Sequence, residues 1–384
     1  MAPQPAARVA LEAQLAALLE NGIAAGVPGF AAAITSSKDL LWQSHAGLSD
    51  LLGSKPIDKD SSFGIGSITK TFVAVVILQL LDEGRLGLRD TVGRFLRPEV
   101  YRGIENAEGA TVSDLLRHRA GVDSWEDDPV WIRDGRGDRL KVDHIWSKTE
   151  PLGYIRRPRI EAPDPGQWYY SNTNFTLLGL IIEAVTNSPA EEEIRRRILE
   201  PLGMEHTYME GFEPPNSATV PRRYHSATSQ FRDAAGINDA FEEVRDNIID
   251  TTGSNLSTEW TAGGLVSSIP DMLKFCLALR DGKLLSPTSL GLMKDWKPTT
   301  ESHDFGRGLF RVMAPDTGTK WIGHFGSVLG FTAGLVWQEE GDCAVCVLAN
   351  VGTVHSEKVP SSAAGVVLRT NFLNIASRLA EHNP

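Results

Sequence analysis

Strand-like segments lie near both ends of this chain, and helical patterns fill much of the stretch between them. The strand-like segments occupy residues 29–35, 40–46, 308–312, 321–325, 331–337 and 344–349. Apolar residues at helical spacing predict helices at 67–81 and 172–186. Because the strands come from both ends, they must pair across the helical block. The pattern predicts an α+β fold of the α/β/α type, in which a mixed, mostly antiparallel sheet is flanked by helices and an all-helical sub-domain is inserted.

We expect a single domain over residues 1–384, because no linker and no internal repeat divides the chain. Its α/β part comprises about residues 7–84 and 263–384, and its helical insertion about residues 85–204. Residues 205–262 are rich in Pro, Gly, Ser, Asn and Asp and show little periodicity. Unpatterned segments of that length are usually functional, so this one is predicted to be a loop region that shapes a site.

The charge and the N-terminus narrow the possible partners and the location. A net charge of −11 argues against nucleic acid and anionic membranes as partners. No apolar run reaches the roughly 18 residues of a membrane span. The N-terminus predicts an amphipathic helix and not a signal peptide, which favours a cytoplasmic protein, although a mature secreted form behind a new methionine would look the same. We expect no metal and no cofactor, and the sequence indicates no oligomeric state.

Cys343 and Cys346 have the Cys-x-x-Cys spacing of some redox and zinc sites, but they lie in a strand-like segment. Residues three apart on a strand point to opposite faces, so the two thiols cannot readily pair. We expect buried core cysteines instead.

Ser67 and Lys70 form the chain's one Ser-x-x-Lys, at the start of an apolar helix. Residues three apart lie on one face of a helix, so the hydroxyl and the amine can meet there. A serine becomes nucleophilic when a base takes its proton, and a lysine shielded from water can lose its own. The pair predicts a serine nucleophile with a proton partner, but taken alone it also fits an ordinary helix start.

A second motif, Tyr170-Ser171-Asn172, comes just before a helix. The phenol can serve as a base if nearby cations favour its ionised form. The amide of Asn172 can grip a lysine or a substrate amide. A packed tyrosine followed by a helix cap is the simpler interpretation of this motif alone.

A third motif runs from His324 to Ser327 on a predicted strand. Glycine in a strand lets a ligand approach the backbone closely. The backbone N–H of Ser327, paired with that of Ser67, can then face a developing oxyanion. Taken alone, His324 also fits a core histidine.

In this order the three motifs resemble the serine β-lactamase-like family, which has the β-lactamase/transpeptidase-like fold. The family includes class C β-lactamases, D-alanyl-D-alanine carboxypeptidases, D-aminopeptidases, D-amino-acid amidases and family VIII carboxylesterases. Further familial segments are Leu115 to Gly121, Pro165-Gly166, Pro201 to Met204 and Ala262 to Ser268. The similarity covers about residues 10–350.

The resemblance implies that Ser67 forms an acyl-enzyme and that Lys70 and Tyr170 share its proton, with the identity of the acylation base left open. The N–H groups of Ser67 and Ser327 would form the oxyanion hole. Asn172 would hold both the acyl side chain of the substrate and Lys70.

The resemblance also assigns His324, Phe325 and Gly326 to substrate binding. β-Lactamases usually have Lys-Thr-Gly at these positions, and the loss of the fixed lysine cation disfavours efficient β-lactamase activity. Histidine is charged only part of the time near neutral pH, and Phe325 is expected to add an apolar wall. The His-x-Gly form resembles D-aminopeptidases, D-amino-acid amidases, some D,D-peptidases and esterases.

A D-stereospecific hydrolase of small amides or short peptides is therefore the leading hypothesis. A carboxylesterase or ester-dependent acyltransferase would use the same serine. A non-catalytic ligand-sensing domain is a further alternative, which the joint presence of the motifs disfavours. The acidic segment Trp125 to Asp128 could supply charge at the edge of the site, although a solvated loop is favoured, and Arg136-Gly137-Asp138 is interpreted as a polar turn.

Overall fold

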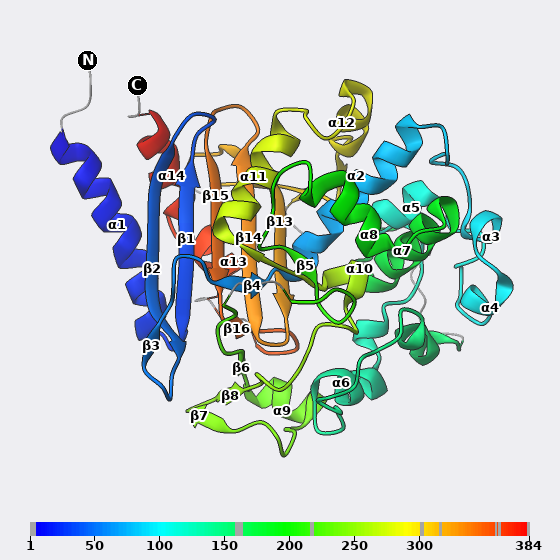
Figure 1. Cartoon of the computed structure of the whole chain (residues 1–384), viewed down its shortest axis with the longest axis horizontal. Coiled ribbons are helices and arrows are strands. Elements are labelled where there is room, and N and C mark those ends of the chain that lie inside the picture. Colours follow the sequence, from blue (N-terminus) through cyan, green and yellow to red (C-terminus); the bar gives the residue numbers. More distant parts are fainter. Residues whose placement is uncertain are drawn as a thin grey trace.

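The main sheet joins strands from the two ends of the chain, as the sequence predicts. The computed structural model describes residues 5–157, 164–215, 219–299, 303–314, 317–357, 359 and 362–381. In spatial order the strands are β10 (Lys297–Pro298), β11 (Asp304–Phe305), β12 (Phe310–Met313), β13 (Lys320–Val328), β14 (Phe331–Gln338), β15 (Ala344–Ala349), β1 (Gly29–Thr35), β2 (Leu40–Asp50) and β3 (Lys55–Pro56) (Figure 1). Every neighbouring pair in this sheet is antiparallel. The α+β class is confirmed.

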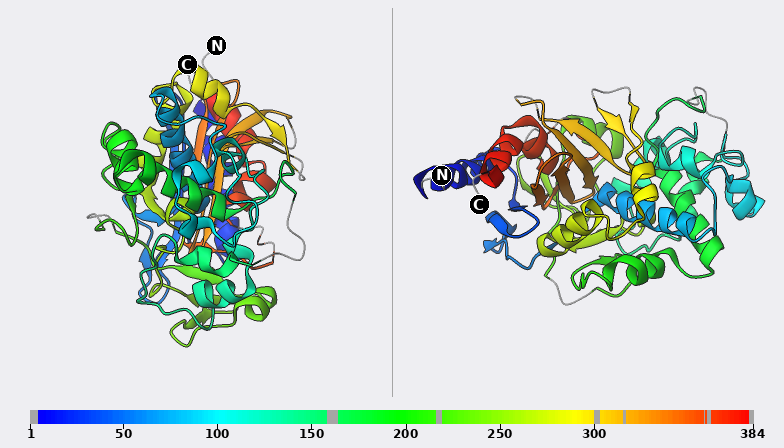
Figure 2. Two further views of the ribbon diagram at one scale, coloured as in Figure 1. Left: turned by 90° about the vertical axis from the view of Figure 1, so that its right-hand side faces the viewer. Right: turned by 90° about the horizontal axis from the view of Figure 1, so that it is seen from above.

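Helices cover both faces of this sheet because its strand residues are apolar on both sides. Along β1, Ala32 and Ile34 pack with one core, whereas Ala31 and Ala33 pack with the other. The first core lies under α1 (Pro5–Ala24), α13 (Ala363–Arg369) and α14 (Phe372–Glu381). The second lies against α2 (Thr69–Asp82) and α11 (Ile269–Arg280). Both termini lie at the end of the molecule formed by α1 and α14 (Figure 2).

The helical insertion lies beside the sheet, at the end marked by α2 (Figure 1). Its elements are α3 (Val92–Phe95), α4 (Pro98–Tyr101), α5 (Val112–Leu116), η2 (Trp125–Asp127), α6 (Pro129–Arg136), η3 (Glu150–Ile155), α7 (Asn172–Thr186), α8 (Ala190–Ile194) and η4 (Arg195–Leu199). The bounds of α7 are those predicted, and this helix packs against α2 and α5. None of the described helices is long and apolar enough to cross a membrane.

Residues 205–262, which the sequence predicts to be loop, contain several short regular elements. They are β5 (Tyr208–Met209), β6 (Tyr224–Ser226), α9 (Ser229–Ala235), β7 (Glu243–Arg245), β8 (Ile248–Asp250) and the start of α10 (Trp260–Gly263). Strands of two or three residues are too short to produce a periodic pattern. They pair in two small sheets with β16 (Val351–Gly352), β4 (Ser62–Gly64) and β9 (Leu265–Ser268), and the β16–β6 pair is parallel. A last helix, α12, spans Pro287–Met293.

Cys343 and Cys346 are both buried and free, as predicted. Cys343 packs in the core beneath α1 and α14, whereas Cys346 packs in the core on the other face of the sheet. The prediction of core cysteines on opposite faces is therefore confirmed.

Candidate active site

Ser67 lies in the 3-10 turn η1 (Gly66–Ile68), which leads directly into α2. Gly66 has a φ of +52°, and a Cβ atom on it would lie 2.8 Å from the backbone nitrogen of Ser327 on β13. A glycine is needed here both for the left-handed backbone and for the close approach of the turn to the strand. The turn thereby sets Ser67 beside the end of β13.

Lys70 projects from the first turn of α2 onto Ser67. Its Nζ lies 2.8 Å from the Ser67 Oγ and donates to the Ala262 carbonyl oxygen at 2.6 Å. The side chain has no solvent-exposed surface, and this burial lowers the pKa of the ammonium far below its ordinary value. A lysine in this setting can exist as the neutral amine, which is able to accept the proton of a neighbouring hydroxyl.

Three charged side chains lie close to Lys70 and form what we call the inner cluster: Glu126 in η2, Arg136 at the end of α6, and Glu259 just before α10. Arg136 is 1% exposed and pairs with Glu126 and, at 2.7 Å, with Glu259. Both carboxylates raise the pKa of Lys70, which partly opposes the effect of burial. The cluster is thus part of the electrostatic setting of the lysine. No group of three or more His, Cys, Asp or Glu side chains in the described residues could hold a metal ion.

Tyr170 lies immediately before α7, with its phenol in hydrogen-bond contact with the Ser67 hydroxyl. The Nζ of Lys70 lies 5.0 Å from the centre of its ring. Burial, together with the carboxylates of Glu126 and Glu259, raises the pKa of Tyr170 above its ordinary value. A phenolate base at Tyr170 would require nearby cations that favour its ionised form, but the surroundings favour the neutral phenol, which is a proton donor.

Asn172 occupies the first position of α7 and is 2% exposed. Its Nδ2 donates to the Glu126 carboxylate, and its Oδ1 has no hydrogen-bond partner among the described residues. The predicted grip of Asn172 on Lys70 is absent, because the lysine donates to Ser67 and Ala262 instead. The free amide oxygen remains available to a donor on a substrate.

The residues of the third motif divide between the two faces of β13. A Cβ on Gly326 would lie 2.0 Å from the Ile65 carbonyl oxygen, so this glycine faces the turn that carries Ser67. Phe325 is partly exposed and packs against the core beneath α1 and α13. The ring therefore lies on the opposite face of β13 from Gly326, and the predicted apolar wall does not stand beside that glycine.

His324 is 2% exposed, with its ring 6.5 Å from that of Tyr170. Its Nδ1 lies 2.7 Å from the Phe325 carbonyl oxygen, a contact in which Nδ1 must be the donor, so Nε2 carries the lone pair. Burial, followed by repulsion from Lys70, lowers its pKa to about 3. This histidine is consequently neutral near pH 7 and does not replace the lysine cation of the Lys-Thr-Gly form.

His118 was noted in the sequence only as part of a familial segment. Its ring stacks on Tyr170 with centroids 4.2 Å apart, and its Nδ1 accepts the Ser171 backbone N–H at 3.1 Å. Burial lowers the pKa of the ring, which keeps Nδ1 an acceptor. Its contacts fix the ring of Tyr170 and the residue that follows it.

Comparison with known proteins fits this arrangement. The family profile described as Beta-lactamase matches residues 11–364. The chain belongs to the beta-lactamase family. Its fold is accordingly the β-lactamase/transpeptidase-like fold expected from the sequence.

Solved beta-lactamase-family structures match nearly the whole chain. D-amino acid amidase from Ochrobactrum anthropi SV3, complexed with D-phenylalanine, has 26% sequence identity and a TM-score of 0.79, with 97% of this chain and 98% of the amidase covered. The D-stereospecific amidohydrolase from a Streptomyces species has 26% identity and a TM-score of 0.78, with 93% of this chain and 97% of that enzyme covered.

Among curated relatives, esterase EstB of Burkholderia gladioli is 30% identical over 207 residues. PbpX of Bacillus subtilis (strain 168), named as a candidate penicillin-binding protein, is 28% identical over 292 residues, or 76% of this chain. The matched regions span 50% and 62% of the lengths of these two relatives. The beta-lactamase family to which the chain belongs thus contains serine hydrolases with amidase, esterase and peptidase names.

Proposed function

We propose that this protein is a serine hydrolase that forms an acyl-enzyme on Ser67 and cleaves small amides or short peptides with D-stereospecificity. The observation that carries the proposal is the 2.8 Å contact between the Ser67 hydroxyl and a fully buried Lys70 of lowered pKa. The amidase and amidohydrolase structures that match more than nine-tenths of the chain support the amide class and its stereochemistry.

In the proposed acylation step, neutral Lys70 takes the Ser67 proton as Oγ bonds to the substrate carbonyl carbon. The lowered pKa of Lys70 and the raised pKa of Tyr170 make the lysine the better base. The N–H groups of Ser67 and Ser327 receive the negative charge that develops on the carbonyl oxygen.

Collapse of the tetrahedral intermediate breaks the carbon–nitrogen bond. The leaving amine takes a proton from the phenol of Tyr170, which is reprotonated from the Lys70 ammonium. Water then repeats the sequence in reverse, freeing the acid and restoring Ser67. The partly exposed Glu126 carboxylate beside Asn172 is suited to bind a substrate ammonium, as free D-amino-acid amides would require.

The neutral His324 argues for amides and esters over substrates that present a carboxylate next to the scissile bond. Without a fixed cation at this position, binding of such a carboxylate loses its charge-assisted hydrogen bond. An esterase is the second candidate, supported by the similarity to EstB. An ester leaving group needs less protonation than an amine.

The test is a substrate panel of D- and L-phenylalanine amides, D- and L-aminoacyl p-nitroanilides and short p-nitrophenyl esters. We expect D-amides and D-anilides to be cleaved at least tenfold faster than their L-forms. Hydrolysis of esters alone would establish the esterase instead.

A fluorophosphonate probe followed by whole-protein mass spectrometry tests the nucleophile. The wild type should gain one adduct, Ser67→Ala should gain none, and Ser37→Ala, at an exposed serine in the turn between β1 and β2, should react as the wild type does. An adduct that persists in Ser67→Ala would show that another residue is the nucleophile.

A further inference from the structure

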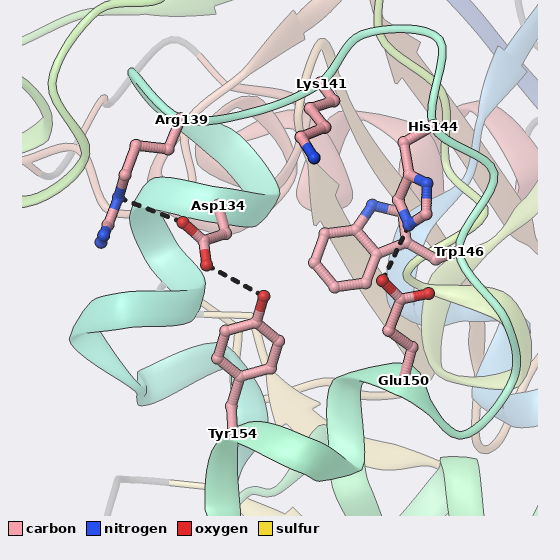
Figure 3. A pocket seen from close by; sticks show the side chains of 7 residues that line it. All are labelled: Asp134, Arg139, Lys141, His144, Trp146, Glu150 and Tyr154. Carbon is pink, nitrogen blue, oxygen red and sulfur yellow. Dashed lines mark hydrogen bonds and ion pairs between the residues drawn. The ribbon is translucent and has the colours of Figure 1, made fainter.

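A concave site lies on the far side of α6 from the inner cluster. It is a pocket of about 380 Å³ between α6, η3 and the loop that joins them (Figure 3). This volume is within the range of small-molecule sites. Asp134 lines it, while Arg136, two residues on and therefore on the opposite side of the helix, lies in the inner cluster. The pocket uses no residue assigned to catalysis.

Two hydrogen-bond donors in this pocket have no acceptor. Lys141 is exposed, and its Nζ reaches towards the cavity from above, on the side to which the indole nitrogen of Trp146 also points (Figure 3). Neither the ammonium nor the indole N–H has a hydrogen-bond partner among the described residues. Trp146 is only 4% exposed, so its indole is held in place, and its N–H is free to bond to a pocket occupant.

The acceptors on the pocket walls, in contrast, are already used. Asp134 accepts from the Tyr154 hydroxyl at 3.0 Å and pairs with Arg139 at 3.1 Å. Glu150 pairs with His144 at 2.8 Å. The pocket therefore offers free donors and few free acceptors, which favours an anionic occupant over a cationic one.

Hydrogen bonds with residues outside the pocket hold the loop that carries these donors in place. The Trp146 backbone N–H donates to the Ser257 Oγ at 2.9 Å. The Asn255 side chain donates to the carbonyl oxygens of Val142 and His144 at 3.3 and 3.0 Å. The rings of Trp146 and Tyr154, 6.0 Å apart, provide an apolar surface below the donors. A preformed shape of this kind costs little ordering on binding.

We propose that this pocket binds a small carboxylate that bears an apolar or aromatic group, with its carboxylate on Lys141 and Trp146 and its apolar part against the two rings. Free amino acids, the carboxyl ends of short peptides and simple aromatic acids all belong to this class. The inference is independent of the proposed function, because it involves binding only and none of the catalytic groups.

Isothermal titration calorimetry with phenylacetate tests the site, with 2-phenylethanol, which has no hydrolysable bond, as the uncharged control. We expect saturable binding of phenylacetate in the millimolar range and none of the alcohol. Lys141→Met should weaken binding by about tenfold, the loss expected for one charge-assisted hydrogen bond. Lys59→Met, at an exposed lysine outside the pocket, is the matched control and should bind as the wild type does.

Trp146→Phe, which keeps an aromatic surface and removes the N–H, should weaken binding less than Lys141→Met does. D-phenylalanine is titrated as a second ligand. If phenylacetate binds and D-phenylalanine does not, the ligand class is a simple acid; if both bind, it is an amino acid or the carboxyl end of a peptide. Absence of saturable binding up to about 10 mM, or equal affinity in Lys141→Met, would overturn the proposal.

Discussion

The charged groups on the two sides of α6 differ in their access to water. In the inner cluster, Arg136 and Glu259 are 1% and 4% exposed. In the pocket on the other side of α6, which we call the outer pocket, Arg139 and Asp134 are 51% and 28% exposed. The ion pairs on one side of this short helix are thus largely shielded from water, whereas those on the other side are solvated.

This difference decides what each group can do. Inside the protein, charges interact strongly and an unpaired one is costly, so the charges of the inner cluster must stay paired. From this position they act on the pKa of Lys70. Ion pairs in contact with water are screened and contribute little to the free energy of folding. The charged groups of the outer pocket can therefore exchange their partners for a ligand. The inner cluster suits proton chemistry, and the outer pocket suits reversible binding.

The largest expected effect comes from breaking the inner cluster. Arg136→Met leaves the buried Glu259 carboxylate and the partly exposed Glu126 carboxylate without their guanidinium, and we expect the free energy of unfolding to fall by about 3 to 5 kcal/mol in urea titrations. Adding Glu126→Gln and Glu259→Gln to the same chain should recover much of the loss. A loss below about 1 kcal/mol for Arg136→Met would mean that the cluster is not dry.

The next effect is on the pH dependence of catalysis. The Glu259 carboxylate raises the pKa of Lys70, so Glu259→Gln should lower that pKa further. Because the base must be deprotonated, the acidic limb of kcat/KM should shift to lower pH in the variant. Glu99→Gln, at an exposed glutamate on α4, should leave the limb in place. A limb that stays fixed or moves to higher pH in Glu259→Gln would contradict the role given to the inner cluster.

Salt should affect ligand binding at the outer pocket and the pH dependence of catalysis to different extents. Raising the ionic strength from about 0.1 to about 1 M shortens the screening length from roughly 10 to 3 Å. We expect phenylacetate binding at the outer pocket to weaken severalfold, while the acidic limb of kcat/KM stays nearly constant. Equal sensitivity of the two quantities to salt would remove the distinction between a wet and a dry site.

The smallest effect is expected from the outer ion pair itself. Arg139→Met removes a partner of Asp134 that is half exposed, so the free energy of unfolding should change by no more than about 1 kcal/mol. The measurement is the urea titration used for Arg136→Met. A loss comparable to that of the inner arginine would show that exposure does not separate the two groups.

The sequence was sufficient to predict the features that rest on local pattern. Apolar periodicity gave α7 its observed bounds, and the strand-like segments at both ends do form one sheet. Ser67 and Lys70 are three residues apart at a helix start, so their contact follows from helix geometry. The fold class followed from the strand-like segments at both ends of the chain, and the family followed from the order of the three motifs.

The inner cluster could not be predicted in the same way. Glu259 and Arg136 are 123 residues apart in the chain, and no periodic signal connects them. Arg136 was interpreted as part of a polar turn, and for Glu126 a solvated loop was favoured over a source of charge at the edge of the site, yet the first is 1% and the second 18% exposed. Both errors have one cause, because burial of a charge depends on partners that only the folded chain brings together.

The position of Phe325 was predictable in principle. Alternation along β13 places it on the opposite face from Gly326, and the period of two was visible in the sequence. Treating His324, Phe325 and Gly326 as a single unit of the familial motif obscured that alternation. Whether the surroundings of Tyr170 favour its ionised form could not be read from the sequence, since its burial and the carboxylates that oppose its ionisation depend on distant segments.

The three free cysteines allow the opening of this protein to be followed by thiol labelling. Cys343 lies in the layer beneath α1 and α14, and Cys276 and Cys346 lie in the layer on the other face of the sheet. Each thiol is buried, and burial raises its pKa, so an alkylating reagent can react only after the surrounding layer has opened. The order in which the three are labelled therefore records which side of the sheet comes apart first, without any label having to be engineered.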